Sequence, residues 1–266
     1  MATINVTGKL ETVVGTDVRD EITVTGNLND VIAGEGGDDV RVIGNINNVS
    51  GGLGTDTINA FGNNNTLNGD EGSDTISAIG QNNKINGGSG NDRLTSIGGR
   101  AIVSGGTGND VINITGNNNS ISGDADNDRI TVSGNRNTIS GGSGDDTIFV
   151  LSGFFNTVDG GEGNDIITGS SNADTISGGD GDDIITAGGG SDNLTGGEGS
   201  DEFRLAFGSN VIINDYIEGV DSIIVGGSAL GALPAPNTDG SYSITNSAGE
   251  TLTITFGADS VLGGAV

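Results

Sequence analysis

The chain has 266 residues, 52 glycines, no cysteine, no histidine and a formal net charge of −27. Without cysteine and histidine it has no disulfides, no thiolate metal sites, no zinc sites of the usual kind and no histidine general base. The acidic balance disfavours nucleic acid and anionic membranes as partners, whereas the many aspartates favour a hard cation with oxygen ligands.

The first residues already follow an 18-residue register. Ile4 and Val6 recur as Ile22 and Val24, and nothing resembling a cleavable signal peptide precedes them. The first turn, residues 15–20, keeps its last aspartate but lacks most glycines, so we expect it to bind metal poorly or not at all. The turn at residues 34–38 is the first that comes close to the later pattern.

Between Gly51 and Asp146 the pattern GGxGxD returns with a fixed 18-residue period. An apolar pair follows each aspartate at alternate positions, as in Ile58 and Ala60, and a further apolar residue such as Leu67 follows half a coil later. Period-two alternation over short runs indicates strands, and the glycine and asparagine clusters between them indicate turns. Two strands and two turns per period predict an all-β fold, a parallel β-roll or β-solenoid of 18-residue coils.

The turns half a coil away from the GGxGxD motifs are rich in asparagine. They read GNNN or similar at residues 62–65, 80–83, 116–119 and 134–137. Asparagine tolerates left-handed backbone and can form stacked amide ladders. These turns are therefore either metal-free and held by amide hydrogen bonds, or a recognition face for sugar or another surface.

Near Phe154 and Phe155 the chain gains one residue, which we interpret as a bulge. The turn spacing then halves to a nonapeptide period, so both edges are expected to carry GGxGxD-like turns from residue 160 to 201. The turn at residues 169–174 is a degenerate copy.

The repeat fades after Phe203, and a hairpin is expected at residues 242–256 around the turn 246–249. The predicted organisation is a roll of 18-residue coils with one motif-bearing edge over 1–159, a nonapeptide roll over 160–204, and a β cap with the C-terminal region over 205–266. No apolar run is long enough to span a bilayer.

Repeated GGxGxD followed by an alternating apolar pair resembles the RTX (haemolysin-type) calcium-binding repeats. The resemblance implies that residues 213–223 close the roll, that residues 258–266 contain an uncleaved type I secretion signal, and that the protein is secreted. Calcium is expected to bind the turn aspartates and the backbone carbonyls that the glycines turn inward. The expected ligands are Gly36, Asp38, Gly52, Gly54, Asp56, Gly72, Asp74, Gly88, Gly90, Asp92, Gly106, Gly108, Asp110, Asp128, Gly142, Gly144, Asp146, Gly161, Gly163, Asp165, Asp174, Gly179, Gly181, Asp183, Asp192, Gly197, Gly199 and Asp201.

Physical reasoning couples this metal to folding. The apolar residues of one coil do not offset the entropy of ordering its backbone, and stacked carboxylates about 4.8 Å apart repel one another. Several calcium ions between successive turns reverse that repulsion. We expect calcium on one edge from about Gly34 to Asp146 and on both edges after Gly160, with a weaker or altered site where Asp126 replaces a glycine.

No catalytic constellation is evident, so an enzyme is not expected. The favoured function is a structural, self-assembling extracellular protein of a surface layer, matrix or filament; the alternative is a polysaccharide- or ice-binding module. Copies are expected to join end to end, through residues 1–14 and the hairpin 241–256. A lateral contact is the second route, through Ile43, Phe61, Ile79 and Ile97 if these face outward.

Overall fold

A computed structural model describes residues 1–231 and 233–262 of the chain. Within these residues the secondary structure is entirely β, and no helix is long and apolar enough to cross a membrane. The chain divides into two compact units, Met1–Thr131 and Val132–Val266. Residues 263–266 of the expected secretion-signal region lie outside the described part.

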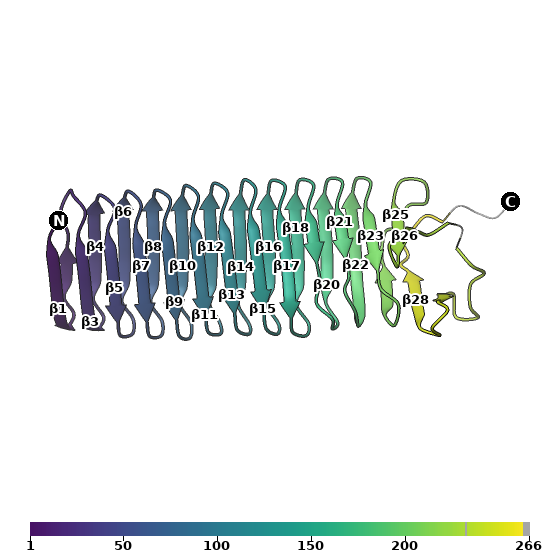
Figure 1. Cartoon of the computed structure of the whole chain (residues 1–266), viewed down its shortest axis with the longest axis horizontal. Coiled ribbons are helices and arrows are strands. Elements are labelled where there is room, and N and C mark those ends of the chain that lie inside the picture. Colours follow the sequence, from purple (N-terminus) through teal and green to yellow (C-terminus); the bar gives the residue numbers. More distant parts are fainter. Residues whose placement is uncertain (232, 263–266) are drawn as a thin grey trace. The chain divides into compact units, whose positions relative to one another are not determined.

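Unit 1 is a parallel β-solenoid in which consecutive strands alternate between two sheets (Figure 1). Sheet A contains β1 (Thr3–Lys9), β3 (Glu21–Asn27), β5 (Asp39–Ile43), β7 (Thr57–Phe61), β9 (Thr75–Ile79), β11 (Arg93–Ile97) and β13 (Val111–Thr115). Sheet B contains β2 (Thr12–Val14), β4 (Asp30–Glu35), β6 (Asn48–Leu53), β8 (Thr66–Glu71), β10 (Lys84–Ser89), β12 (Ile102–Thr107) and β14 (Ser120–Ala125). The strand β15 (Arg129–Ser133) contains the boundary between the units.

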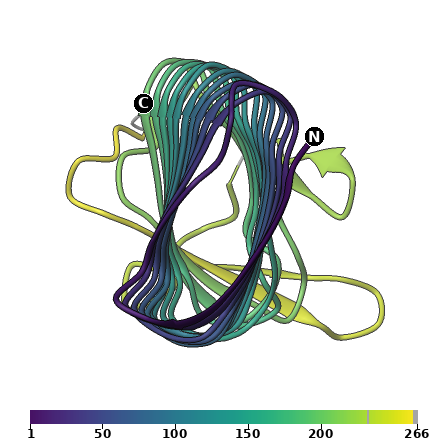
Figure 2. The ribbon, with the colours of Figure 1, turned by 90° about the vertical axis from the view of Figure 1, so that its left-hand side faces the viewer.

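The strand pairs in unit 1 are offset by one 18-residue period. Ile58 pairs with Val40 on one side and with Ile76 on the other, so each side chain stacks on its equivalent in the next coil. Viewed end on, the coils are flattened loops with one strand of each sheet on the long sides (Figure 2). The expected parallel β-roll is thus confirmed.

The alternation of apolar and polar residues places the core between the two sheets. Ile58, Ala60 and Leu67 are at most 1% exposed, and their equivalents in neighbouring coils are buried in the same way. Two polar side chains per coil, such as Asp56 and Asn65, are also buried, one at each end of the flattened loop. The interior therefore consists of an apolar centre between two polar rows.

Unit 2 has the same construction. One of its sheets contains β17 (Thr147–Ser152), β19 (Ile166–Thr168), β21 (Ile184–Thr186), β23 (Glu202–Leu205), β25 (Ser222–Val225) and β26 (Ser228–Ala229). In this sheet β19, β21 and β23 are shorter than the strands of unit 1 that they resemble. The other contains β16 (Thr138–Ser143), β18 (Thr157–Glu162), β20 (Thr175–Asp180), β22 (Ser191–Glu198), β24 (Asn210–Ile213), β28 (Thr251–Phe256) and β27 (Tyr242–Thr245).

The inserted residue lies slightly before the position we expected. Gly62 packs against the carbonyl of Gly44, exactly one regular period earlier in the chain. Gly153 packs in the same way against the carbonyl of Gly134, which is one position further back than that period. The extra residue therefore belongs to the exposed end of β17, at Leu151–Ser152, and not to the turn with the two phenylalanines. Strand pairing tolerates it there because the side chain points to solvent.

The C-terminal hairpin is confirmed. β27 and β28 pair antiparallel, with Tyr242 opposite Ile254 and Thr245 opposite Thr251, and β28 adds in parallel to β24. Phe256 packs against Tyr216 and Tyr242, with ring centroids 5.3 and 5.5 Å apart. This aromatic cluster joins the hairpin to the segment that follows the last full repeat.

Candidate metal centre: the Asp edge

The turns that lead from sheet B to sheet A carry the GGxGxD motifs; we call this side of the solenoid the Asp edge. Their glycines adopt backbone conformations that other residues rarely adopt. Gly54 has φ +132°, and a Cβ atom there would lie 1.6 Å from the carbonyl oxygen of Gly36. All predicted glycine ligands share a positive φ: Gly36, Gly52, Gly54, Gly72, Gly88, Gly90, Gly106, Gly108, Gly142, Gly144, Gly161, Gly163, Gly179, Gly181, Gly197 and Gly199.

The aspartates of the Asp edge form one buried row in each unit, which we call the Asp row. The backbone N–H of each aspartate donates to Oδ1 of the aspartate in the following coil, for example Asp56 to Asp74 at 2.7 Å and Asp165 to Asp183 at 2.8 Å. This contact was not anticipated from the sequence. Equivalent bonds in unit 1 begin at Asp20, Asp38, Asp74, Asp92 and Asp110, and in unit 2 at Asp146, Asp183 and Asp201.

The second carboxylate oxygen has no donor in most of these residues. In the Asp row, Oδ2 is buried without a hydrogen-bond partner in Asp38, Asp56, Asp74, Asp92, Asp110, Asp165 and Asp183, and the same holds for Asp192 of the opposite edge. A buried acceptor that carries charge is costly unless a donor or a cation satisfies it. Each of these coils therefore holds an unsatisfied anionic oxygen beneath its turn.

A second oxygen converges on the same place. A Cβ atom added to Gly69 would lie 2.3 Å from Oδ2 of Asp74 and 2.4 Å from the carbonyl oxygen of Gly87 in the next coil. The same pair of oxygens surrounds Gly51, Gly87, Gly105, Gly141, Gly160 and Gly178. The first glycine of each motif thus leaves open a cradle lined by one carboxylate oxygen and one carbonyl oxygen.

Burial makes these carboxyl groups weak acids. Desolvation is the largest cause, and it raises the pKa of Asp56, Asp74, Asp92 and Asp110 to about 6 despite the hydrogen bond from the preceding coil. In unit 2 it raises the pKa of Asp165, Asp183 and Asp192 to about 7 and that of Asp201 to about 6. A proton or a metal ion is needed to neutralise them.

The donor set fits calcium. All candidate atoms are oxygens, which a hard cation prefers, and calcium takes six to eight of them. Among the described residues no three acidic side chains lie close enough to hold a metal on their own, so carbonyl oxygens must supply most of the shell. The Asp-row Oδ2 atoms and the turn carbonyls would hold the ion, which would neutralise the row.

The turns from sheet A to sheet B form the opposite side, the Asn edge. The backbone N–H of Asn47 donates to Oδ1 of Asn65 at 2.9 Å, as in the Asp row. The amide nitrogen of Asn65, in contrast, donates to the carbonyl of Gly44 at 3.1 Å. Asn29, Asn47, Asn65, Asn83 and Asn119 occupy this buried row in unit 1, with Ala101 interrupting it.

Three turn aspartates, Asp20, Asp126 and Asp174, differ from the regular residues of the Asp row. Oδ2 of Asp20 accepts hydrogen bonds from the backbone N–H and the hydroxyl of Thr16, at 2.6 and 2.8 Å. Asp174 is satisfied in the same way by Ser170, at 3.0 and 2.7 Å. Asp126 has φ +74° and its carboxylate accepts the N–H of Gly108 at 3.0 Å. Asp20 and Asp174 therefore lack the free oxygen of their neighbours.

In unit 2 the asparagine row continues as aspartate. Asn156 donates its N–H to Oδ1 of Asp174, and Asp174 donates to Oδ1 of Asp192, both at 3.0 Å. Of these two aspartates, Asp192 has the unsatisfied Oδ2. The remaining predicted aspartates, Asp128, Asp146 and Asp201, are at most 3% exposed and lie in the Asp row.

The sequence analysis did not include two carboxylates that accept hydrogen bonds from the last motif-bearing turn. Oδ1 of Asp221 accepts the N–H of Asp201 at 3.1 Å, and its Oδ2 accepts that of Ile217 at 2.7 Å. The two oxygens of Asp215 accept the N–H groups of Gly196 and Gly197, at 2.9 and 2.8 Å. The signal was present, because Asp221 follows Asp201 at close to one period.

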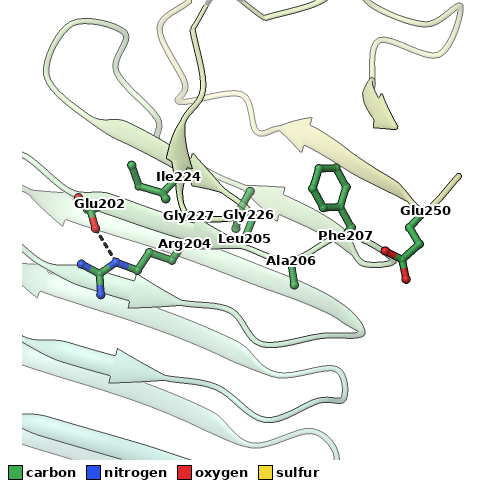
Figure 3. Close-up of a pocket in the computed structure, with 9 residues that line it drawn as sticks. All are labelled: Glu202, Arg204, Leu205, Ala206, Phe207, Ile224, Gly226, Gly227 and Glu250. Atoms are coloured by element: carbon green, nitrogen blue, oxygen red, sulfur yellow. Dashed lines mark hydrogen bonds and ion pairs between the residues drawn. The ribbon is translucent and has the colours of Figure 1, made fainter. Parts of the chain in front are cut away.

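A separate hollow of about 700 Å³ lies beside the cap in unit 2 (Figure 3). Its wall is largely apolar, with Leu205 and Phe207, and Arg204 pairs with Glu202 at 2.5 Å. Glu202 and Glu250 lie at opposite ends of the hollow (Figure 3), so they do not form a pair of carboxylates for acid–base chemistry. We assign no chemistry to it.

Comparison with known families agrees with this geometry. A family model described as "RTX calcium-binding nonapeptide repeat (4 copies)" matches residues 24–40, 44–76, 72–99, 152–185, 168–203 and 177–212, just over half of the chain. A second model, "Protein of unknown function (DUF3060)", matches residues 102–151. No curated protein matches the chain. By its repeats, its parallel solenoid and its row of buried aspartates, the chain belongs to the RTX calcium-binding repeat family.

Proposed function

We propose that this chain is a secreted β-roll protein that folds when it binds calcium and then serves as a structural, self-assembling component outside the cell. It would serve there in a surface layer, a matrix or a filament. The observation that carries the proposal is the set of buried Oδ2 atoms without donors in the Asp row. RTX repeats bind calcium, and the family is typically structural and secreted by the type I route.

Calcium is the ligand because it removes the cost of the buried charge. In each regular coil the proposed ligands are the Asp-row Oδ2, the carbonyl of the first glycine in the next coil and carbonyls of the other turn glycines. Without the metal, the carboxyl group either carries an uncompensated buried charge or binds a proton. Metal binding therefore supplies part of the folding free energy, and chelation withdraws it.

We propose that metal content follows the two edges. In residues 1–159 calcium binds along the Asp edge alone, since the Asn edge satisfies its own hydrogen bonds. In residues 160–204 the opposite edge adds Asp192, whose Oδ2 is unsatisfied, and Asp174 contributes less because Ser170 occupies its second oxygen. Residues 205–266 form the cap and include the proposed secretion signal.

Assembly is proposed because large apolar side chains face solvent in a row. Phe61, Ile79 and Ile97 are 38%, 41% and 47% exposed at the same position of successive strands of sheet A, and Ile43 precedes them. Contiguous exposed apolar residues on a flat sheet mark an interaction surface. The end-to-end route through residues 1–14 and the hairpin 241–256 stays a second proposal.

One feature favours the alternative of a polysaccharide-binding module. Gly99 stands where the neighbouring coils of the Asn edge have Asn63, Gln81 and Asn117. It lines a polar hollow of about 430 Å³ together with Gln81, Arg100 and Asn118. Amide and guanidinium groups suit sugar hydroxyls, but no aromatic ring lines this hollow for stacking. Binding to a glycan array in millimolar calcium tests this alternative.

Circular dichroism with and without a chelator tests calcium-coupled folding. We expect a β-sheet spectrum in millimolar calcium and a disordered spectrum after chelation, because extracellular calcium modules bind at about 10⁻⁴–10⁻³ M. Asp110→Ala should remove about one site and lower the melting temperature in calcium by several degrees. Asp20→Ala is the matched control, since Thr16 already satisfies that carboxylate and calcium stoichiometry should not change. A spectrum that the chelator leaves unchanged contradicts the proposal.

A further inference from the structure

The outer face of sheet A differs in charge from the rest of this acidic protein. Its outward residues from β7 to β13 are Thr57, Asn59, Phe61, Thr75, Ser77, Ile79, Arg93, Thr95, Ile97, Val111, Asn113 and Thr115, of which none is acidic. Acidic residues are absent here although the whole chain carries a net charge of −27. Highly charged chains repel one another, so this stretch without acidic side chains is where two copies approach most easily. Asp39 of the preceding strand, β5, is the acidic residue at its border.

The strand registers arrange this face into straight rows. The apolar row comprises Ile43, Phe61, Ile79 and Ile97, which pair in consecutive strands. A second row lies at the start of each of these strands and consists of Asp39, Thr57, Thr75 and Arg93. We call it the charged row because its two end residues carry opposite charges. The two rows occupy opposite margins of the same face, with the acid and the base at opposite ends of the charged row.

We propose that a second copy of this chain docks on this face in a two-fold symmetric dimer, in which the solenoid axes of the two copies run antiparallel. The inference rests on the self-assembly proposed above and names its contact. The two-fold axis runs along the strands, between β7 and β9. This symmetry places Phe61 against Ile79 of the partner subunit and Ile43 against Ile97 of the partner subunit, so that the apolar rows meet.

The same symmetry brings opposite charges together. Asp39 lies opposite Arg93 of the partner subunit, and the contact occurs twice. Asp39 is half-exposed and 3.5 Å from Arg19, so its carboxylate remains accessible to a second cation. Arg41 lies over the ring of Phe61 at 5.1 Å and supports that ring at the surface. Apolar and charged residues are therefore both complementary under one rotation.

The other simple arrangement is less favourable. Sheets that pack face to face keep their strands within about 30° of one another, which leaves an axis along the strands or one along the solenoid. An axis along the solenoid would place the apolar row against the charged row of the partner and bury Asp39 against Ile43. Only the axis along the strands matches like with like in the apolar row.

The test is a charge-swap experiment on the full chain in millimolar calcium, read by sedimentation equilibrium. The face is narrow, so we expect dimers at about 0.1 mM protein and above. Asp39→Arg or Arg93→Asp alone should raise the dissociation constant roughly threefold to tenfold, and the two together should restore it. A purely structural effect of either change would not be restored by the other.

Two further measurements complete the test. Phe61→Ser with Ile79→Ser should raise the dissociation constant more than about tenfold, whereas Ile32→Ser with Ile102→Ser, equally exposed on sheet B, should not. Because the chain has no cysteine, Ile43→Cys and Ile97→Cys proteins can be mixed with a short bismaleimide linker. Cross-linking should need both proteins.

The outcomes separate this inference from the proposed function. If the calcium-loaded chain assembles but the double charge swap stays weak and the mixed cysteines do not link, the antiparallel contact is wrong and another route operates. If the chain remains monomeric at about 1 mM protein, both the contact and the self-assembling role fail. Folding on calcium, measured separately by circular dichroism, is unaffected by either result.

Discussion

The Asp edge and the Asn edge use one backbone plan with opposite electrostatic results. At both edges a buried side-chain oxygen accepts the N–H of the equivalent residue in the preceding coil, at 2.7 Å for Asp74 and 2.9 Å for Asn65. The amide of Asn65 then donates to a carbonyl, while the corresponding oxygen of Asp74 has nothing to accept. One atom, nitrogen or oxygen, decides whether the buried side chain is satisfied by the protein or leaves an anionic oxygen without a partner.

Removing the difference between the edges should give the largest effect. We expect Asp56→Asn, Asp74→Asn, Asp92→Asn and Asp110→Asn together to abolish most calcium binding by unit 1, since the buried anionic oxygens disappear. The folding of this unit should then depend far less on calcium. Calorimetry and circular dichroism of the full chain measure both effects. Unchanged stoichiometry would show that the carboxylates are not ligands.

Acid should distinguish the edges in a similar way. In the calcium-free chain the raised pKa values of about 6 mean that the folded state binds more protons than the unfolded state above pH 3.8. The free energy of unfolding should therefore fall as pH rises from about 4 to 6, and to about 7 where unit 2 contributes.

We expect the chelated chain to gain β structure when it is acidified from pH 7 to pH 4, as followed by circular dichroism. Calcium affinity should change in the opposite direction, because protons compete for the same oxygens. The fourfold asparagine variant is the control, and the pH dependence that unit 1 contributes should be much smaller in it. A chelated wild-type chain equally disordered at both pH values contradicts the role of these carboxyls.

The smallest effect is expected from a substitution that fills the gap in the asparagine row at Ala101. Ala101 has no side-chain oxygen for the N–H of Asn83, whereas its own N–H donates to Oδ1 of Asn119 at 2.8 Å. Ala101→Asn should restore the row and raise the free energy of unfolding by about 1 kcal/mol, seen as a melting temperature a few degrees higher. Ala78→Asn, buried among apolar residues, is the control and should be destabilising. A melting temperature that falls in both variants would contradict the ladder.

The fold was predictable from the sequence because core residues and turn residues repeat with the same 18-residue period. Ile58 and Ala60 alternate toward the core, glycines mark turns, and the 18-residue spacing alone sets the register of the strand pairs in unit 1. The hairpin of β27 and β28 was also predictable, because alternating apolar and polar residues flank an Asn-Ser-Ala-Gly turn. Local pattern and tertiary pairing coincide in a solenoid.

The site was predicted less completely because its atoms come from different coils. The aspartates and glycines were identified from the sequence. It could not be predicted that Oδ1 accepts a hydrogen bond while Oδ2 has no partner, because this depends on how neighbouring turns are positioned relative to one another. The left-handed position of the Asn edge shows the same limit. Asparagine occupies it at Asn64, but Leu28, Ile46 and Arg100 adopt nearly the same φ, +62°, +60° and +58°. Neighbouring coils impose this conformation on residues that do not favour it.

The segment around Asp215 and Asp221 has a consequence for how such a solenoid can end. Every regular coil relies on its successor to accept the N–H groups of its turn, and the last regular coil has no such successor. Carboxylate oxygens of Asp215 and Asp221 supply those acceptors, at 2.8–3.1 Å from the backbone nitrogens of the last turn. They take the place of the acceptors that a further coil would provide. Repeats could be added or lost ahead of this segment in evolution, while the ending itself stays the same.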